Sequence, residues 1–200
     1  EGDYRAALHE YRRGLRLKPN DVNLINSLGV ALVECNQLRA AARCFQDALA
    51  LEPKNYMALV NLGRVRQSFG QQDGALECFE QAYAAYADDR ATGQELFLPL
   101  GWLLLSAGKS QQAIAVLCRY LERSGHDHEY LPFRLLGLGY LEQGQADKAI
   151  QACQQALRLL PHDSIALSVL GLLYVEQGEG SELGLSLCDK ALALDNFNPD

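Results

Sequence analysis

Residues 28–53 read LGVALVECNQLRAAARCFQDALALEP, and the order of residue types in this segment recurs along the chain. A Leu-Gly pair opens the segment, an Ala and an aromatic residue follow, and then come a second small residue and a closing Pro. Between Ala41 and Leu49 the apolar residues fall at i, i+3, i+4 and i+7, the spacing of an amphipathic helix. The segment therefore predicts a pair of helices that carry small residues where they cross.

A Leu-Gly pair recurs in the repeat phase at five places, at spacings of 34, 38, 36 and 34 residues. The pairs are Leu28-Gly29, Leu62-Gly63, Leu100-Gly101, Leu136-Gly137 and Leu170-Gly171. A small residue follows each pair in the same phase, as Ala41, Ala75, Ala113, Ala149 and Gly184. This pattern resembles the tetratricopeptide repeat, whose period is 34 residues. The resemblance covers essentially the whole chain and implies an all-α fold, a right-handed superhelical solenoid of antiparallel helix pairs.

We assign the 200 residues to a single array of six units. The units are 1–21 (second helix only), 22–55, 56–93, 94–129, 130–163 and 164–198. The turn between the two helices of a unit needs a left-handed residue, which favours Gly and then Asn. The predicted turn residues are Gly2, Asn36, Gly70, Gly108, Gly144 and Gly178. One helix pair cannot bury its apolar face alone, so the pairs must stack.

The repeat is irregular around residues 90–129. About four extra residues precede the fourth unit, and Tyr120 stands where the other units have Ala or Gly, which should push the two helices apart. Pro99 lies inside the first helix of that unit, so we expect a kink or a late helix start there, with a change in curvature between the third and fifth units. The alternative is simple drift in a tolerant loop.

Both ends of the array look incomplete, because the first unit lacks its first helix and the last unit lacks a polar capping helix. We expect that the chain is a piece of a longer, bacterial protein. The other interpretation is that end-to-end association covers the bare faces, which would make the chain a homo-oligomer through its uncapped ends.

Charge and hydropathy exclude two classes of partner. The formal net charge is -7 at pH 7, and residues 94–200 carry 7 Lys and Arg against 13 Asp and Glu. Such a surface repels phosphates, so no nucleic-acid partner is expected. The longest apolar run, residues 96–105, is far shorter than the roughly 20 residues that a membrane-spanning helix needs. No membrane partner is expected either.

The sequence contains no catalytic motif and no metal-ligand pattern. Nucleophile elbows, phosphate loops and zinc-protease helices are missing. Five of the six cysteines, Cys44, Cys78, Cys118, Cys153 and Cys188, fall near the middle of successive second helices, too far apart for disulfides. We interpret them as small buried residues, which fits a reducing, cytoplasmic location. The cluster from His126 to Glu129 lies in a predicted loop and lacks fixed geometry, so no metal, cofactor or enzymatic activity is expected.

In the resembling family, ligand contacts come from first-helix residues six, three and two before the Gly of the Leu-Gly pair and from the residue after it. Carried onto this chain, these positions are Asn23, Asn26, Ser27, Val30, Met57, Val60, Asn61, Arg64, Glu95, Leu98, Pro99, Trp102, Leu131, Arg134, Leu135, Leu138, Ile165, Ser168, Val169 and Leu172. We expect the peptide-binding residues of this concave face to be Asn26, Asn61, Arg64, Trp102, Leu131, Arg134 and Leu138. The alternative is that the solenoid winds tightly and these residues pack internally.

The resemblance therefore implies a non-catalytic scaffold that binds an extended or helical peptide segment of a partner protein on its concave face. Asn61 can pair with a peptide backbone, while Arg64 and Arg134 can pair with a carboxylate. The clamp that some relatives use for chaperone C-termini is not expected, because Val30, Glu95 and Pro99 replace residues it needs. The alternative function is a sensory or substrate-recognition arm of a multidomain enzyme, a signalling cyclase or a glycosyltransferase, whose catalytic domain lies outside this chain.

Overall fold

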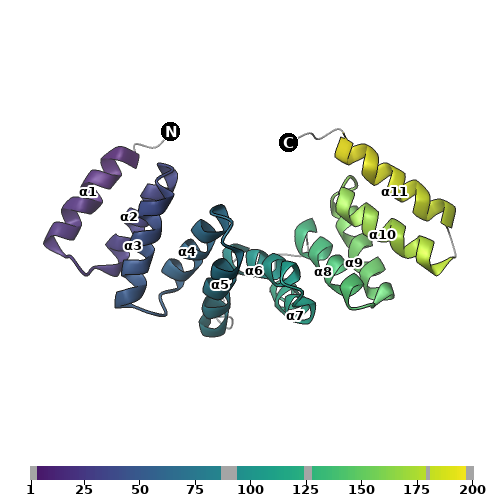
Figure 1. Cartoon of the computed structure of the whole chain (residues 1–200), viewed down its shortest axis with the longest axis horizontal. Helices are drawn as coiled ribbons and strands as arrows, with labels where there is room; N and C mark the ends of the chain where they lie inside the picture. Colours follow the sequence, from purple (N-terminus) through teal and green to yellow (C-terminus); the bar gives the residue numbers. More distant parts are fainter. Residues whose placement is uncertain (1–3, 87–93, 124–127, 179–180, 197–200) are drawn as a thin grey trace. The chain divides into compact units, whose positions relative to one another are not determined.

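The structure is a computed structural model that describes residues 4–86, 94–123, 128–178 and 181–196. The described residues form eleven α-helices and contain no strand (Figure 1). Contacts between residues divide the chain into two compact units, unit 1 (residues 1–96) and unit 2 (residues 97–200). The predicted all-α array of helix pairs is therefore confirmed.

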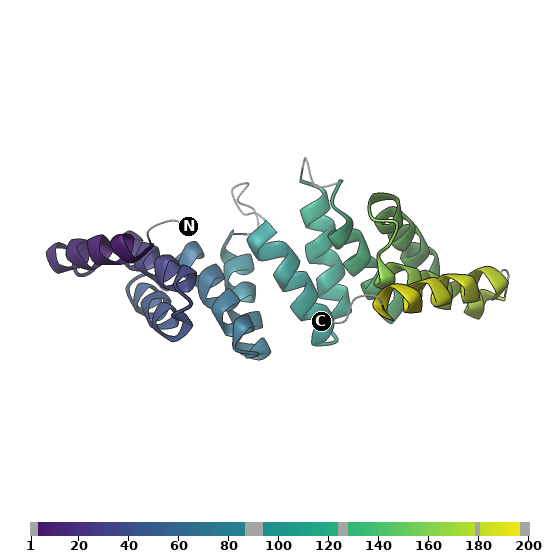
Figure 2. The same cartoon turned by 90° about the horizontal axis from the view of Figure 1, so that it is seen from above.

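Unit 1 contains α1 (Tyr4–Leu17), α2 (Val22–Glu34), α3 (Leu38–Leu51), α4 (Tyr56–Ser68), α5 (Gln72–Tyr86) and the first residues of α6 (Gln94–Ser106). The rest of α6 belongs to unit 2, together with α7 (Ser110–Leu121), α8 (Tyr130–Glu142), α9 (Ala146–Leu159), α10 (Ser164–Gln177) and α11 (Ser181–Asn196). Within each unit, helices that follow one another in the chain pack side by side, as α10 and α11 do in both views (Figure 1 and Figure 2).

Three of the first helices begin at a side-chain cap. The carboxylate or amide oxygens of Asp21, Asn55 and Asp163 accept the backbone N–H three residues later, at 3.1, 3.0 and 3.0 Å. Each bond satisfies one of the N–H groups that a helix N-terminus leaves without an intrahelical partner. These residues fix the points where α2, α4 and α10 begin.

The turns inside the helix pairs have the predicted left-handed residue. Asn36, Gly70, Gly108, Gly144 and Gly178 all have φ between 56° and 74°, so this prediction is confirmed, while Gly2 lies outside the described residues. In the α4–α5 turn the N–H of Gln71 donates to the carbonyl of Arg66 at 2.9 Å, which closes the last turn of α4. Pro19, Pro53 and Pro161 each follow a helix that ends two residues earlier.

The expected late start of the helix that contains Pro99 is wrong. α6 begins at Gln94 and contains Pro99 as its sixth residue. Pro99 lies in the second turn, where it removes the hydrogen bond to the Glu95 carbonyl, and the helix nevertheless continues through it to Ser106. The kink, the other outcome expected at Pro99, stays a prediction. The four extra residues expected before this unit, 90–93, lie outside the described residues.

Tyr120 is accommodated in the core of unit 2. Its side chain is fully buried, and its ring lies 5.7 Å from the ring of Phe97 at an angle of 34°. The Tyr120 hydroxyl donates to a carboxylate oxygen of Glu129 at 2.8 Å, so its polar atom is also satisfied.

The glycine of every Leu-Gly pair lies against a side chain of the second helix. A Cβ added at Gly63 would come within 2.9 Å of the Phe79 ring, and one at Gly101 within 2.8 Å of a Leu117 methyl group. Gly29 faces Phe45, Gly137 faces the Cys153 sulfur, and Gly171 faces the Cys188 sulfur in the same way. The first helix can approach the second this closely only because these positions carry no side chain.

No helix within the described residues combines the length and the apolar character needed to cross a membrane.

Substituting Gly63→Ala is expected to destabilise the chain. The added methyl group must displace the fully buried Phe79 ring, at a cost of about 1–3 kcal/mol, which outweighs a helix-propensity gain of up to about 1 kcal/mol. The measurement is urea denaturation followed by circular dichroism. Gly14→Ala in α1 is the matched control, because its added methyl group meets only Leu24 side-chain carbons and should change stability little. A Gly63→Ala variant more stable than the native chain would contradict this packing.

The Cys153 thiol predicts a loss of stability at alkaline pH. Burial raises the pKa of Cys153 to about 12, and the Asp163 carboxylate adds to the shift. In the unfolded chain the thiol ionises near 9.0, so between pH 9 and 12 the unfolded state binds fewer protons than the folded state. The free energy of unfolding must therefore fall as pH rises through this window. Urea denaturation at several pH values should show a shallower fall for Cys153→Ala, whereas equal slopes would contradict the assignment.

Candidate functional site

The seven predicted site residues divide between the two units. Asn26, Asn61 and Arg64 lie on α2 and α4 of unit 1, where they line two adjoining pockets. Trp102, Leu131, Arg134 and Leu138 lie on α6 and α8 in unit 2.

The larger of these two pockets has a volume of about 390 Å³ and is lined by α1, α2, α4 and the cap of α4. Its lining residues are Tyr4, Ala7, Tyr11, Asn23, Asn26, Ser27, Val30, Ala31, Asn55, Met57 and Asn61. The smaller pocket, of about 130 Å³, is lined by Val30, Val33, Glu34, Leu38, Asn61, Arg64, Val65 and Ser68. Val30 and Asn61 line both, so the two pockets adjoin.

A chain of hydrogen bonds fixes the orientation of the Asn26 amide. The Asn55 oxygen must accept, because it caps α4 through the Ala58 N–H, and the Asn55 nitrogen donates to Glu52 at 2.8 Å. Asn26 can therefore meet the Asn55 oxygen only with its own nitrogen, which donates at 3.0 Å. The Asn26 side chain is only 8% exposed, and its oxygen is buried without a hydrogen-bond partner in the described part of the chain.

Asn61 adds the complementary atom. Its Nδ2 is also buried and finds no hydrogen-bond acceptor among the described residues. Leaving a buried polar atom unpaired costs about 1–3 kcal/mol. Two side chains that line the larger pocket thus each hold one buried polar atom without a partner among the described residues, an acceptor on Asn26 and a donor on Asn61.

In unit 2, the guanidinium of Arg134 pairs with a carboxylate of this chain. Arg134 Nη1 lies 3.4 Å from the Asp163 carboxylate, whose side chain is 1% exposed, and the guanidinium stacks 5.6 Å from the Tyr130 ring centre. Asp163 also caps α10, so Arg134 ties α8 to the start of the next helix pair. The buried carboxylate needs this counter-charge, which gives Arg134 a structural role, and its contact with a ligand carboxylate stays a prediction.

Asn26 and Arg134 occupy equivalent positions in their helix pairs. Each lies three residues before the Gly of a Leu-Gly pair and contacts the capping residue 29 positions later, Asn55 or Asp163. Sequence analysis placed both residues on the ligand-binding face and missed the two caps as their partners. One signal in the sequence could have found these contacts: an Asn or Asp stands directly before the first helix of the next pair, 29 residues after the residue that contacts it.

The predicted face positions differ systematically in exposure. Met57 and Ile165, six residues before their glycines, are exposed, and so are Arg64, Trp102 and Leu172, which directly follow theirs. These two positions are seven residues apart, nearly two full turns, so they share one face. The positions two and three before the glycine are mixed: Asn26, Val60, Leu135 and Val169 are buried, whereas Ser168 is exposed. The alternative of internal packing therefore holds for these four buried residues.

The exposed part of the unit 2 face is apolar. Trp102, Ile165 and Leu172 are 43%, 41% and 44% exposed. Leu131 and Leu138 are half-buried, and Leu138 packs against the core of α9 and α10. Of the predicted residues in unit 2, Trp102 is thus the most open to a partner.

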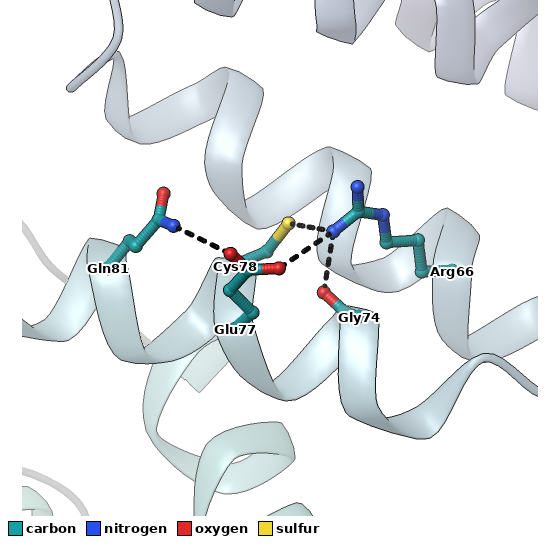
Figure 3. Close-up of polar contacts among 5 residues, drawn as sticks. All are labelled: Arg66, Gly74, Glu77, Cys78 and Gln81. Atoms are coloured by element: carbon teal, nitrogen blue, oxygen red, sulfur yellow. Dashed lines mark hydrogen bonds and ion pairs between the residues drawn. The ribbon is translucent and has the colours of Figure 1, made fainter.

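Arg66 forms a polar cluster that sequence analysis did not predict. Figure 3 shows it extending from α4 toward α5, where Nη1 donates to the Gly74 carbonyl at 2.8 Å and to the Cys78 sulfur at 3.2 Å. Glu77 lies 3.9 Å from the same nitrogen. Burial raises the pKa of the Cys78 thiol, and the adjacent guanidinium only partly offsets this. The cluster therefore joins two helices around a neutral thiol.

The cysteines and the predicted loop cluster provide no metal centre in the described residues. All six cysteines are free, with Cys78 and Cys153 buried and the others half-buried. Within the described ranges, no three His, Cys, Asp or Glu side chains gather as metal ligands would. His126 and Asp127 lie outside these ranges.

Replacing Arg134 by Met is expected to lower the free energy of unfolding by about 1.5–3 kcal/mol, because the buried Asp163 carboxylate loses its charged partner. Chemical denaturation is the measurement. The double variant Arg134→Met with Asp163→Asn should recover part of the loss, because the amide still caps α10 without a buried charge. A single variant with native stability would contradict a structural role for Arg134.

Comparisons with known proteins agree with this architecture. The tetratricopeptide repeat family model matches residues 26–90 and 134–199, which together make up more than half of the chain. No curated protein matches the chain.

Several solved structures have the same fold. YrrB, a TPR protein with an unusual peptide-binding site, is 21% identical, with a TM-score of 0.80 over 92% of this chain and 91% of YrrB. MamA is 25% identical, with a TM-score of 0.70 over 84% of this chain and 95% of that one. A MamA segment from Desulfovibrio magneticus RS-1 is 19% identical, with a TM-score of 0.70 over 90% and 97%. With its helix pairs, its Leu-Gly contacts and the two matched regions, the chain belongs to the tetratricopeptide repeat family.

Proposed function

We propose that the chain is a non-catalytic interaction scaffold that binds a peptide segment of a partner protein through the two adjoining pockets that α2 and α4 line in unit 1. The observation that carries the proposal is this pair of pockets, which share Val30 and Asn61 and lie beside the exposed Arg64. Every peptide bond offers one N–H donor and one carbonyl acceptor. The Asn61 amide, at the junction of the two pockets, can pair with such a group.

Two further features support a peptide as the ligand. Arg64 is exposed at the smaller pocket, with no ion-pair partner among the described residues, and it can meet a ligand carboxylate or carbonyl. In unit 2, the exposed Trp102, Ile165 and Leu172 offer an apolar surface of the kind that partners cover. The fold is that of an interaction scaffold, and the peptide-binding site of YrrB lies on the same kind of array.

The decisive variant is Asn61→Leu, which removes the unpaired donor and nearly conserves volume. Stability should stay the same or rise, because Nδ2 makes no hydrogen bond in the free chain. Affinity for the partner should fall about tenfold, the equivalent of one hydrogen bond of about 1.4 kcal/mol. This opposite response separates a binding role from a structural one.

The test begins with affinity capture from the native lysate and identification of bound proteins by mass spectrometry. Synthetic peptides that tile each captured protein are then titrated by fluorescence polarisation. Gln46→Leu is the control, because it removes an exposed amide on α3 that lines neither pocket. If Asn61→Leu, Arg64→Glu and Trp102→Ala all stay folded and bind with native affinity, the proposed surface is not the binding site.

A further inference from the structure

We infer that α1 of one copy of the chain docks against α11 of a second copy through stripes of opposite charge. The inference goes beyond the proposed function, because the residues of neither stripe line the two pockets of unit 1. It follows from the charges of the two helices, the equal spacing of those charges and the exposed leucines of α11.

α1 carries an exposed stripe of arginines in an acidic chain. Residues 4–18 contain five Lys and Arg against one acidic residue, although the whole chain has a net charge of -7. Arg5, Arg12 and Arg16 stand at i, i+7 and i+11, a spacing that places them on one side of the helix. All three are exposed, and none has an ion-pair partner within the described ranges. The positive charge of this stripe is therefore open to a partner.

α11 carries the complementary stripe. Glu182 and Asp189 are exposed, stand seven residues apart and form no ion pair in the part of the chain that the structure describes. Leu185 and Leu192 lie on the same side of the helix, at i+3 and i+10 from Glu182, and are 58% and 61% exposed. This side of α11 therefore offers two carboxylates and two uncovered leucines to a partner.

The equivalent side of α9 is a helix-packing surface. Ile150 and Leu157 stand 35 residues before Leu185 and Leu192, in the same positions of their helix. Both are partly buried against the core that α9 forms with α10. The two leucines of α11 thus occupy positions that contact another helix elsewhere in the array.

The two stripes match in spacing. Arg5 and Arg12 are seven residues apart, which is about 10.5 Å along the helix. Glu182 and Asp189 have the same separation. Two helices that pack side by side, with axes about 8–10 Å apart, can therefore form two charge-assisted pairs at once. The methylene stems of the arginines then cover the leucines of α11 while the guanidinium groups reach the carboxylates.

A second copy of the chain has the charge that the arginine stripe needs. Residues 94–200 carry 13 acidic residues against 7 basic ones, and α11 itself contains three acidic residues and one Lys. The net charge of each copy opposes their approach, but salt at about 0.15 M screens charges more than about 8 Å apart, so the local pairs decide. Because α1 meets α11 and not another α1, the contact is heterologous, and one copy can bind a neighbour through each helix.

The test is sedimentation equilibrium over a wide range of protein concentrations. We expect the average mass of the native chain to rise with concentration. The double variant Arg5→Glu with Arg12→Glu should lower the association constant about tenfold or more, because like charges then face each other. Glu182→Lys with Asp189→Lys should have the same effect, although it changes the net charge in the opposite direction.

The matched control is Lys148→Glu with Arg158→Glu on α9. Both residues are exposed, and the pair of substitutions changes the net charge by the same amount as Arg5→Glu with Arg12→Glu. This control should keep the native association, which separates the two stripes from a general effect of net charge.

Mixing the two double variants of α1 and α11 should restore association. The basic α1 of one variant then meets the acidic α11 of the other, and the two reversed helices also match. A chain that carries all four substitutions keeps the net charge of -7 and should associate like the native chain. Circular dichroism checks that each variant is folded, and only folded variants can complement each other.

Four results would overturn the inference. They are a native chain that stays monomeric at all concentrations, association that neither double variant weakens, double variants that do not complement each other, and a control variant that loses association as they do. A monomeric chain that binds a polyglutamate peptide, and loses it on Arg5→Glu with Arg12→Glu, would identify an acidic partner other than a second copy. The proposed function is tested separately, because Asn61→Leu lies on neither stripe.

Discussion

The close contact between the Leu-Gly glycine and the second helix is the constraint on which the array depends. A first helix approaches a second helix near Phe45, Phe79, Leu117, Cys153 or Cys188 only where it carries no side chain. That approach buries the small residues that recur in phase, including Ala41, Ala75, Ala113 and Ala149, which are all fully buried. The pair then presents one apolar surface to the next pair, and stacking follows.

The contacts between stacked helix pairs explain why some of the predicted face positions on the first helices are exposed and others are buried. The positions beside the exposed face of a first helix contact the neighbouring helices. In two helix pairs the contact is polar, because Asn26 and Arg134 each bond the residue that caps the first helix of the next pair, Asn55 or Asp163. The Asn26 nitrogen donates to Asn55, and its oxygen stays buried without a partner among the described residues. The Arg134 guanidinium pairs with the Asp163 carboxylate. The same helical position thus contacts the cap of the next helix pair in both units.

Sequence periodicity was sufficient to predict the helix pairs, the left-handed turns at Asn36 and Gly70, and the absence of disulfides among cysteines spaced about one unit apart. It was insufficient for features that depend on a partner elsewhere in the chain. The pairing of Arg134 with Asp163 needs the relative placement of two helix pairs, which periodicity alone does not give. The late start expected at Pro99 is wrong because a proline inside a helix removes one hydrogen bond without necessarily ending the helix, and α6 runs through it from Gln94 to Ser106.

The residue that faces the glycine becomes smaller toward the C-terminus, from Phe79 to Leu117 and then to Cys188. Where it is smallest, main chain meets main chain: a Cβ on Gly184 would lie 2.7 Å from the carbonyl oxygen of Gly171. A ring can tilt to admit an extra methyl group, whereas a helix backbone cannot yield without moving the whole helix. A methyl group added in the earlier pairs therefore meets a side chain that can shift, whereas one added at Gly171 or Gly184 can be admitted only by moving α10 and α11 apart.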